Sequence, residues 1–165
     1  MVELWDAYNE KEELLGIDLV RGEKIPEGMY HLVVEVLIKH VDGDYLLTQR
    51  DFNKMGWPGY WEATAGGSAT KGDTPETGIR REAFEEVGIE LSNLELISKH
   101  IDCSAIYYNY LSVVDCDKNS IALQEGETID YKWVNEEEFV KFMNSDDCIP
   151  SQKERLIPYL KSLKI

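Results

Sequence analysis

The chain has 165 residues, 43% of them hydrophobic, with 17 Lys and Arg against 32 Asp and Glu. This length supports one sizeable core, so we expect a single domain over residues 1–165, with residues 1–29 forming an N-terminal hairpin or arm. The formal net charge of -15 repels polyanions, so nucleic acids and acidic membranes are not expected partners. A small phosphorylated molecule is still allowed, because divalent cations and a few basic side chains can reverse the field inside one cleft.

The cysteines and the N-terminal residues bear on the cellular compartment. Cys103, Cys116 and Cys148 are odd in number and lack C-x-x-C spacing, which predicts free thiols in a reducing environment. The chain does not begin with a basic region followed by an apolar run, and no stretch approaches the roughly 20 apolar residues of a membrane span. We therefore expect a cytoplasmic protein, and the sequence leaves a homodimer open.

A β-hairpin is the first element that the pattern predicts after the arm. The β-branched run within residues 30–40 indicates a largely buried strand, and the sequence Asp-Gly-Asp at residues 42–44 predicts a tight turn into a second strand at residues 45–49. Further strands are expected near residues 94–101, 106–114 and 129–134. Strands with few helices between them favour an α+β fold over an alternating parallel one.

A helix is expected to begin after Thr74, an N-cap residue followed by proline, and to end near Gly88. On that helix Glu82, Glu85 and Glu86 are related as i, i+3 and i+4, which places three carboxylates on one face. Their repulsion costs a few tenths of a kcal/mol per pair on an exposed helix, and a divalent cation would remove it. Mg2+ in particular prefers oxygen ligands and binds through one or two carboxylates plus substrate phosphates.

Two more helices are predicted by capping-box spacing, which pairs Asn135 with Glu138 and Ser151 with Glu154. Pro158 is expected to kink or shorten the second of them.

Without further context, the acidic face of the central helix would be a solvated surface with Arg80 and Arg81 as compensating charges. Residues 67–89, however, resemble the Nudix box, G-x5-E-x7-R-E-U-x-E-E-x-G-U, where U is a bulky apolar residue. The matching residues are Gly67, Arg81, Glu82, Glu85, Glu86, Gly88 and Ile89. Asp73 stands where the family usually has Glu, and its shorter side chain bears on how well it braces the loop or Arg81. Ala83 is small for the apolar position.

The resemblance implies an α+β Nudix fold, in which a mixed β-sheet is sandwiched between α-helices. It implies metal-dependent hydrolysis of a diphosphate linkage in a nucleoside diphosphate derivative or similar small molecule, with Mg2+ as cofactor and Mn2+ as an alternative. Glu82 and Glu86 would be the principal metal ligands, with Glu85 and the carbonyl of Gly66 as further ligands. Arg81 would orient Glu82 through a salt bridge, since a fixed guanidinium holds a carboxylate in ligating geometry.

A further carboxylate is expected from the later part of the chain. In many Nudix proteins a Glu six residues before a Trp reaches the metal site or serves as base, and Glu127 stands in that relation to Trp133. Glu125 is an alternative to Glu127. The catalytic residues implied by the resemblance are therefore Glu85, Glu127 and Arg81.

Two basic residues precede the box in the stretch that resembles one branch of the family. Arg50 and Lys54 are the expected substrate-binding residues, because a guanidinium suits bidentate phosphate contact. The alternative for Arg50 is a salt bridge with Asp51 or Glu62. Three aromatic residues nearby would either stack on a base or belong to the core: Trp57, Tyr60 and Trp61.

That branch contains the type 1 isopentenyl-diphosphate isomerases, which residues 21–31, residues 57–61 and the spacing of Glu127 and Trp133 resemble. The isomerases carry a Cys in the loop after the Trp that matches Trp61, and a metal-binding His two residues later. Here those positions are Gly66 and Ser68, although His31 matches another isomerase His. A hydrolase is therefore predicted. The alternatives are an isomerase-like enzyme and a non-catalytic nucleotide-sensing Nudix domain, which commonly lacks the glutamates that this chain has.

Overall fold

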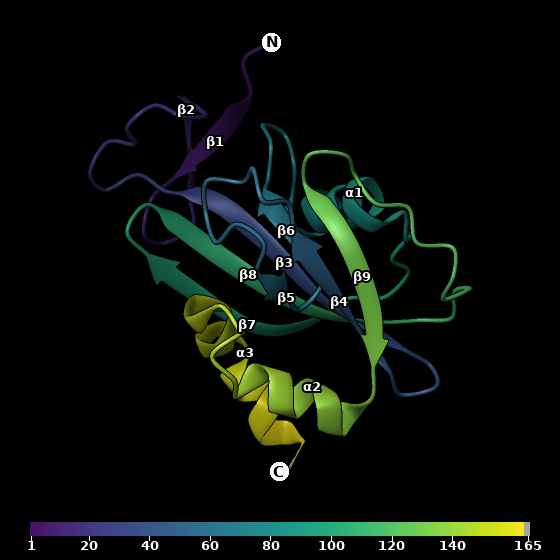
Figure 1. The fold of residues 1–165 in the computed structure, drawn as a ribbon. Coiled ribbons are helices and arrows are strands. Elements are labelled where there is room, and N and C mark those ends of the chain that lie inside the picture. Colours follow the sequence, from purple (N-terminus) through teal and green to yellow (C-terminus); the bar gives the residue numbers. More distant parts are fainter. Residues whose placement is uncertain (164–165) are drawn as a thin grey trace.

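The computed structural model describes residues 1–163 and has the expected α+β class. The elements in chain order, labelled in Figure 1, are β1 (Leu4–Tyr8), β2 (Leu14–Val20), β3 (His31–His40), β4 (Tyr45–Arg50), β5 (Trp61–Glu62), β6 (Ala65–Ser68), α1 (Pro75–Val87), β7 (Glu95–Asp102), β8 (Ala105–Val114), β9 (Thr128–Val134), α2 (Glu136–Met143) and α3 (Pro150–Ser162). No helix within residues 1–163 is long and apolar enough to cross a membrane.

The main sheet has seven strands and is mixed. Its central path runs β5-β4-β3-β8-β7, with β6 paired to β3 and β9 paired to β4. β3 and β8 are parallel, whereas the other neighbours are antiparallel. Figure 1 shows α1 on one side of the sheet and α2 and α3 on the other. The predicted sheet between helices is confirmed, as are the later strands, which are β7, β8 and β9.

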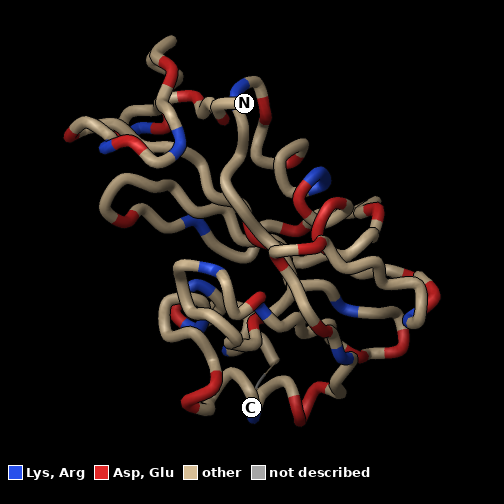
Figure 2. Tube along the Cα trace, turned by 45° about the horizontal axis from the view of Figure 1, so that its top comes forward, with Lys and Arg blue, Asp and Glu red and all other residues tan. Residues whose placement is uncertain are grey.

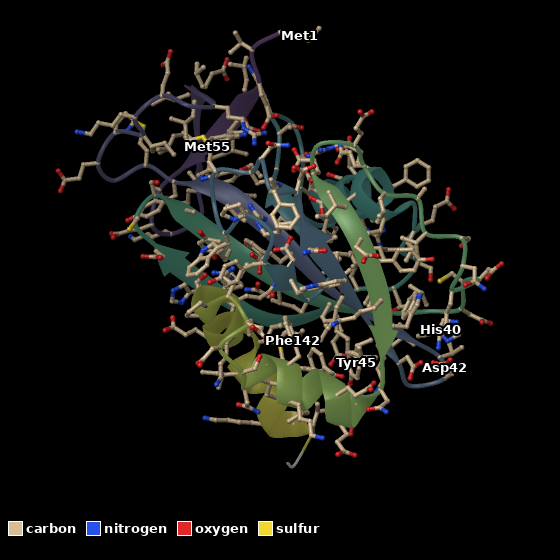
Figure 3. All side chains as sticks on the ribbon, in the orientation of Figure 1. Met1, His40, Asp42, Tyr45, Met55 and Phe142 are labelled. Atoms are coloured by element: carbon tan, nitrogen blue, oxygen red, sulfur yellow. The ribbon has the colours of Figure 1, made fainter. Side chains whose placement is uncertain are left out.

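Side chains alternate along β3, so its two faces belong to different cores. The core on the α1 side contains buried aliphatic residues of the sheet and the helix: Val34, Val36, Ile38, Ile79, Ala83 and Val87. The core on the other side joins the sheet to α2 and α3: Leu37, Tyr45, Leu47, Phe139, Met143 and Leu156. The Tyr45 ring stacks on Phe139 with 4.2 Å between ring centroids, and Figure 3 shows Tyr45 beside α2.

β1 and β2 form a separate two-stranded antiparallel sheet at the N-terminus. Trp5, Ala7 and Leu19 make a small core there, and the Trp5 ring stacks on His31 with centroids 4.0 Å apart. Burial, followed by the nearby charge of Arg21, lowers the pKa of His31 to about 4. His31 is thus a neutral histidine at the start of β3 that packs against the hairpin.

The hairpin of β3 and β4 is confirmed, but the two strands stay together only at its closed end. Lys39 and Tyr45 are their sole pair in the described chain. Beyond it, β6 occupies the edge of β3 at residues 33–36, and β5 pairs with Thr48 and Gln49 of β4. β5 and β6 were not predicted, because a two-residue strand and a strand containing two glycines carry no alternating pattern. The separation of β3 from β4 opens the sheet where the site lies.

Local capping chemistry sets the bounds of α1 and α2. At the start of α1, the Thr74 side chain accepts from the backbone N–H of Thr77, and the Thr77 side chain accepts from the backbone N–H of Thr74. At its end, Gly88 adopts a left-handed φ of 74°. The capping box of Asn135 and Glu138 at the start of α2 is also confirmed.

The predicted capping box of Ser151 and Glu154 does not form, so this prediction is wrong. Helix α3 begins at Pro150 with Ile149 as N-cap, and no side chain caps it. Proline has no N–H to satisfy at the first helical position, so the helix begins there without a cap. Pro158 lies inside α3 and does not end it, because the helix continues to Ser162.

Candidate active site

The acidic face of α1 meets the glycine strand β6. Glu86 is only 7% exposed, and its Oε2 accepts a hydrogen bond of 3.3 Å from the backbone N–H of Gly66. A Cβ on Gly67 would lie 2.6 Å from Oε2 of Glu82, so only glycine allows this approach. The helix thereby presents both carboxylates to the backbone of Gly66 and Gly67.

Arg81 connects the helix to the loop that precedes it. Its Nη1 donates to Oε1 of Glu82 at 2.9 Å and to Oε2 of Glu85 at 3.4 Å. Its Nη2 donates to Oδ2 of Asp73 at 2.9 Å and to the carbonyl of Ser68 at 3.4 Å. The guanidinium therefore holds the Glu82 side chain in place, as a charge-assisted pair does.

The shorter side chain of Asp73 still reaches the groups that a longer Glu would brace. Besides Arg81, its Oδ2 accepts from the backbone N–H of Thr70 at 2.9 Å and from the Thr70 hydroxyl at 3.0 Å. The pKa of Asp73 is lowered overall. Partial burial acts to raise it, but the hydrogen bonds from Arg81 and Thr70 outweigh that effect. The loop and Arg81 are thus fixed by one ionised carboxylate.

Glu62 is a carboxylate of the site that sequence reasoning treated only as a partner for Arg50. Burial, and then the charges of Glu62 and Glu82, raise the pKa of Glu86 well above its ordinary value. Burial also raises the pKa of Glu62 to about 7, although the charge of Arg50 opposes this. Glu62 follows Trp61 in β5, a strand that the sequence did not predict. No pattern in the sequence therefore indicated that Glu62 lies near Glu86.

These carboxylates form an oxygen-rich donor set that suits a hard divalent cation. Glu82 and Glu86, with the nearby carbonyl of Gly66, can supply ligands of the kind that Mg2+ prefers, and a cation would offset the crowding of negative charge around Glu86. In the side chains as they stand, however, no three His, Cys, Asp or Glu groups among residues 1–163 converge closely enough to hold a metal. To bind one, the carboxylates of Glu82, Glu85 and Glu86 would have to move closer together.

A cleft of about 380 Å³ lies beside β6, where β3 and β4 separate. Gly66, Gly67 and Glu62 line one end of it. Four basic side chains also line it: Arg21, Arg50, Lys54 and Arg155. In Figure 2 acidic positions occur along the whole chain, and the basic ones are fewer. Because only three acidic residues of the described chain share its lining, the cleft is richer in cations than the protein as a whole.

The two predicted substrate-binding residues line this cleft, each beside a carboxylate. Arg50 donates from Nε to the carbonyl of Gly56 at 2.8 Å and from Nη1 to Oε1 of Glu62 at 3.4 Å. Lys54 forms an ion pair with Glu127. The structure thus brings Glu127 to Lys54, and Arg50 makes the alternative salt bridge with Glu62 while still facing the cleft.

The three aromatic residues near Arg50 divide between the core and the surface. The Trp61 ring packs on the α2 side of the sheet, and the ammonium of Lys132 lies 4.4 Å from its centroid. Trp57 and Tyr60 are exposed and meet edge to face with centroids 5.0 Å apart.

Comparison with known proteins identifies the family of this site. The model of the NUDIX domain matches residues 29–159. The chain belongs to the Nudix family. An uncharacterised Nudix hydrolase of Listeria monocytogenes is 37% identical to it over 152 residues, which cover 90% of this chain and 89% of that protein. The protein is thus a Nudix hydrolase, as the box predicted.

A second relative matches the expected branch, and a solved structure matches the expected fold. An isopentenyl-diphosphate Delta-isomerase of Salmonella heidelberg is 30% identical over 110 residues, covering 62% of this Nudix chain and 61% of the isomerase. The crystal structure of a Deinococcus radiodurans protein superposes with a TM-score of 0.68 at 21% identity, covering 84% of this chain and 87% of the other. The likeness to the isomerase branch is confirmed. Nudix hydrolases generally act on small diphosphate-linked molecules with divalent metal ions.

Proposed function

We propose that this Nudix hydrolase cleaves the diphosphate linkage of a nucleoside diphosphate derivative or similar small molecule with Mg2+. The ligands of the Mg2+ ion would be the carboxylates of Glu82, Glu85 and Glu86 and the carbonyl of Gly66. The observation that carries the proposal is the burial of Glu86 against β6, beside Glu62 and next to a cleft lined with basic side chains. A buried cluster of carboxylates costs free energy that a divalent cation would offset.

The chemistry is substitution at phosphorus. The oxygen of a water molecule forms a bond to one phosphorus, the bridging P–O bond breaks, and the leaving phosphate keeps the electron pair. A proton of the water passes to a carboxylate, for which Glu85 and Glu127 are the two candidates. A bound Mg2+ supplies positive charge that neutralises the diphosphate and acidifies the water. Arg81 would orient Glu82 through its bond to one carboxylate oxygen, which leaves the other oxygen for the metal.

Arg50 and Lys54 would hold the phosphate oxygens. Both line the cleft, and both are already directed by other groups, Arg50 by the carbonyl of Gly56 and Lys54 by Glu127. A diphosphate carries more negative charge than either single carboxylate, so it competes for these cations when it enters. Manganese would substitute for magnesium, since both ions accept oxygen ligands.

The cellular setting that we propose is the cytoplasm, on the basis of three free cysteines. The net charge of -15 disfavours nucleic acid and membrane surfaces as partners, so the substrate is proposed to be a small molecule.

The test is a panel of diphosphates incubated with the purified protein, Mg2+ and a coupled phosphatase, with released phosphate as the readout. We expect turnover of at least one member, with none in excess EDTA and recovery on adding Mg2+ or Mn2+. Full activity in EDTA would contradict the metal requirement. Binding of nucleotides with no turnover of any member would favour the nucleotide-sensing alternative.

A further inference from the structure

The cleft extends beyond the carboxylates of α1 to a second group of residues from three elements. Glu35 of β3, Tyr107 of β8 and Arg155 of α3 also line it. Strand β3 is next to β6 in the sheet and β8 is one strand further, so we call this side of the cleft its far end. In the pairing of β3 with β6, Glu35 lies opposite Gly66, whose N–H binds Glu86. Neighbouring strands are about 4.8 Å apart, so Glu35 is within reach of a group attached to a diphosphate held at Gly66.

This far end is rigidly organised. Arg155 donates from Nε to one Glu35 oxygen at 3.0 Å and from Nη2 to the other at 2.7 Å, which is a bidentate pair. The guanidinium carbon lies 4.5 Å from the ring centroid of Tyr107, and the Arg155 side chain is only 11% exposed. The Ser98 hydroxyl fixes the Arg155 backbone by donating to its carbonyl at 2.7 Å. The side chains that a ligand would meet are therefore held before it binds.

The chemistry of the lining points to hydroxyl groups. Glu35 and Asp102 offer carboxylate acceptors, whereas Tyr107 and Ser151 offer hydroxyls that have no protein hydrogen-bond partner in the part of the chain that the structure describes. Arg155 retains the Nη1 donors that Glu35 does not use. Alternating acceptors and donors of this kind match a group with several hydroxyls, each of which both donates and accepts.

Other ligand groups fit this end poorly. Among its side chains only Val33 and Ala65 are small aliphatic groups, so an isoprenoid chain would find little apolar surface. Arg155 covers one face of the Tyr107 ring, which limits stacking by a base.

We infer that the far end of the cleft binds a sugar joined to the diphosphate, with Glu35, Tyr107 and Arg155 as specificity-determining residues. This inference rests on the proposed function, because the diphosphate must first be held beside Gly66. The substrate class is therefore a sugar diphosphate ester, and an alkyl diphosphate is disfavoured.

The test compares two five-carbon substrates that differ in their hydroxyls, ribose 5-diphosphate and pentyl diphosphate. Released phosphate is measured with Mg2+ to give kcat and KM for each. We expect the wild-type kcat/KM to be at least about tenfold higher for ribose 5-diphosphate. Tyr107→Phe, which removes one hydroxyl, should lower that preference three- to tenfold through KM, and Glu35→Gln should lower it by about tenfold or more. Neither variant should change kcat/KM for pentyl diphosphate more than twofold.

Glu137→Gln is the matched control for Glu35→Gln, because Glu137 is 80% exposed on α2 and pairs with Lys141. It should leave both substrates unaffected. Equal wild-type kcat/KM for the two substrates, or an equal loss on both in Tyr107→Phe, would overturn the sugar site while the hydrolase function stands. Turnover of no diphosphate at all, in the panel or here, would overturn the proposed function and the sugar site together.

Discussion

Glu86 is the residue on which the proposed chemistry most depends. It is buried, it lies beside the charges of Glu62 and Glu82, and the N–H of Gly66 is its only hydrogen-bond donor within residues 1–163. A carboxylate in such a place costs stability unless it has a cation to bind. Its position is thus explained by function better than by folding.

We expect Glu86→Gln to lower kcat by about two orders of magnitude with Mg2+, because the amide keeps the size but removes a charged oxygen ligand. The variant should remain folded, since a neutral group is easier to bury beside Glu62 and Glu82. Steady-state phosphate release and a thermal unfolding curve check both statements. Glu90→Gln, at an exposed position beyond the end of α1, is the control and should keep full activity. Unchanged turnover in Glu86→Gln would remove this residue from the metal site.

Asp73 provides a prediction on stability and pH. Its pKa is lowered from 3.8 in the folded protein, so its stabilising contribution is present above pH 3.8 and is lost as the pH falls through the lowered value. Asp73→Asn should therefore lower the free energy of unfolding by about 1–2 kcal/mol at pH 7. Near pH 2 the difference from the wild type should shrink.

Urea unfolding of both proteins at pH 7 and near pH 2 measures this difference. Asp73→Glu is the control, because it keeps the charge and restores the residue that the Nudix box usually has. A gap between wild type and Asp73→Asn that is as large in acid as at pH 7 would show that the ion pair with Arg81 is not its cause.

At the level of the elements, the cleft exists because β3 and β4 separate after one pair. β6 and β5 then satisfy the free edges, and this places Gly66 and Glu62 at the opening. Helix α3 closes the far end of the cleft with Arg155, and Oε1 of Gln152 accepts from the backbone N–H of Ala63 at 2.8 Å. The C-terminal helix thus shapes a site whose chemistry comes from α1.

The two helix starts with capping-box spacing should respond differently to alanine. Asn135→Ala should lower the free energy of unfolding by about 1 kcal/mol, because the Asn135 side chain caps the N–H of Glu138. Ser151→Ala should change it by less than about 0.5 kcal/mol, since Ser151 already lies inside α3 and caps nothing. Urea midpoints of the two variants, measured together, give the comparison. An equal loss in both would contradict the assigned start of α3.

For the whole molecule, the likeness to an isomerase raises the question of which reaction this scaffold performs. Isomerisation of isopentenyl diphosphate moves protons on and off carbon, which requires an acid and a base on opposite faces of an apolar pocket. At the positions of the isomerase Cys and His this chain has Gly66 and Ser68, and the cleft beside them is lined mainly by charged and polar groups.

Incubation with isopentenyl diphosphate in deuterated water should therefore give no deuterium in recovered allylic product above a no-enzyme control. Mass spectrometry of the recovered diphosphate provides the measurement. A Salmonella isomerase run in parallel shows that the assay detects exchange. Incorporation by this protein at a comparable rate would overturn the hydrolase assignment.

The sequence by itself determined the local features. The spacing of Arg81, Glu82, Glu85 and Glu86 gave the family, and caps at Thr74 and Asn135 gave two helix starts, because periodicity and capping depend on residues close in the chain. The metal-site roles of these residues stay predictions.

Only the tertiary structure decided which distant residues share the cleft. It placed Glu62 of β5 beside Glu86, and it brought Arg155 to Glu35 across 120 positions of sequence. It also paired Glu127 with Lys54, and no spacing rule in the sequence predicts this ion pair. Strand pairing and helix packing bring these residues together. Both depend on which strand edges pair and which apolar faces become buried, and residues throughout the chain decide that.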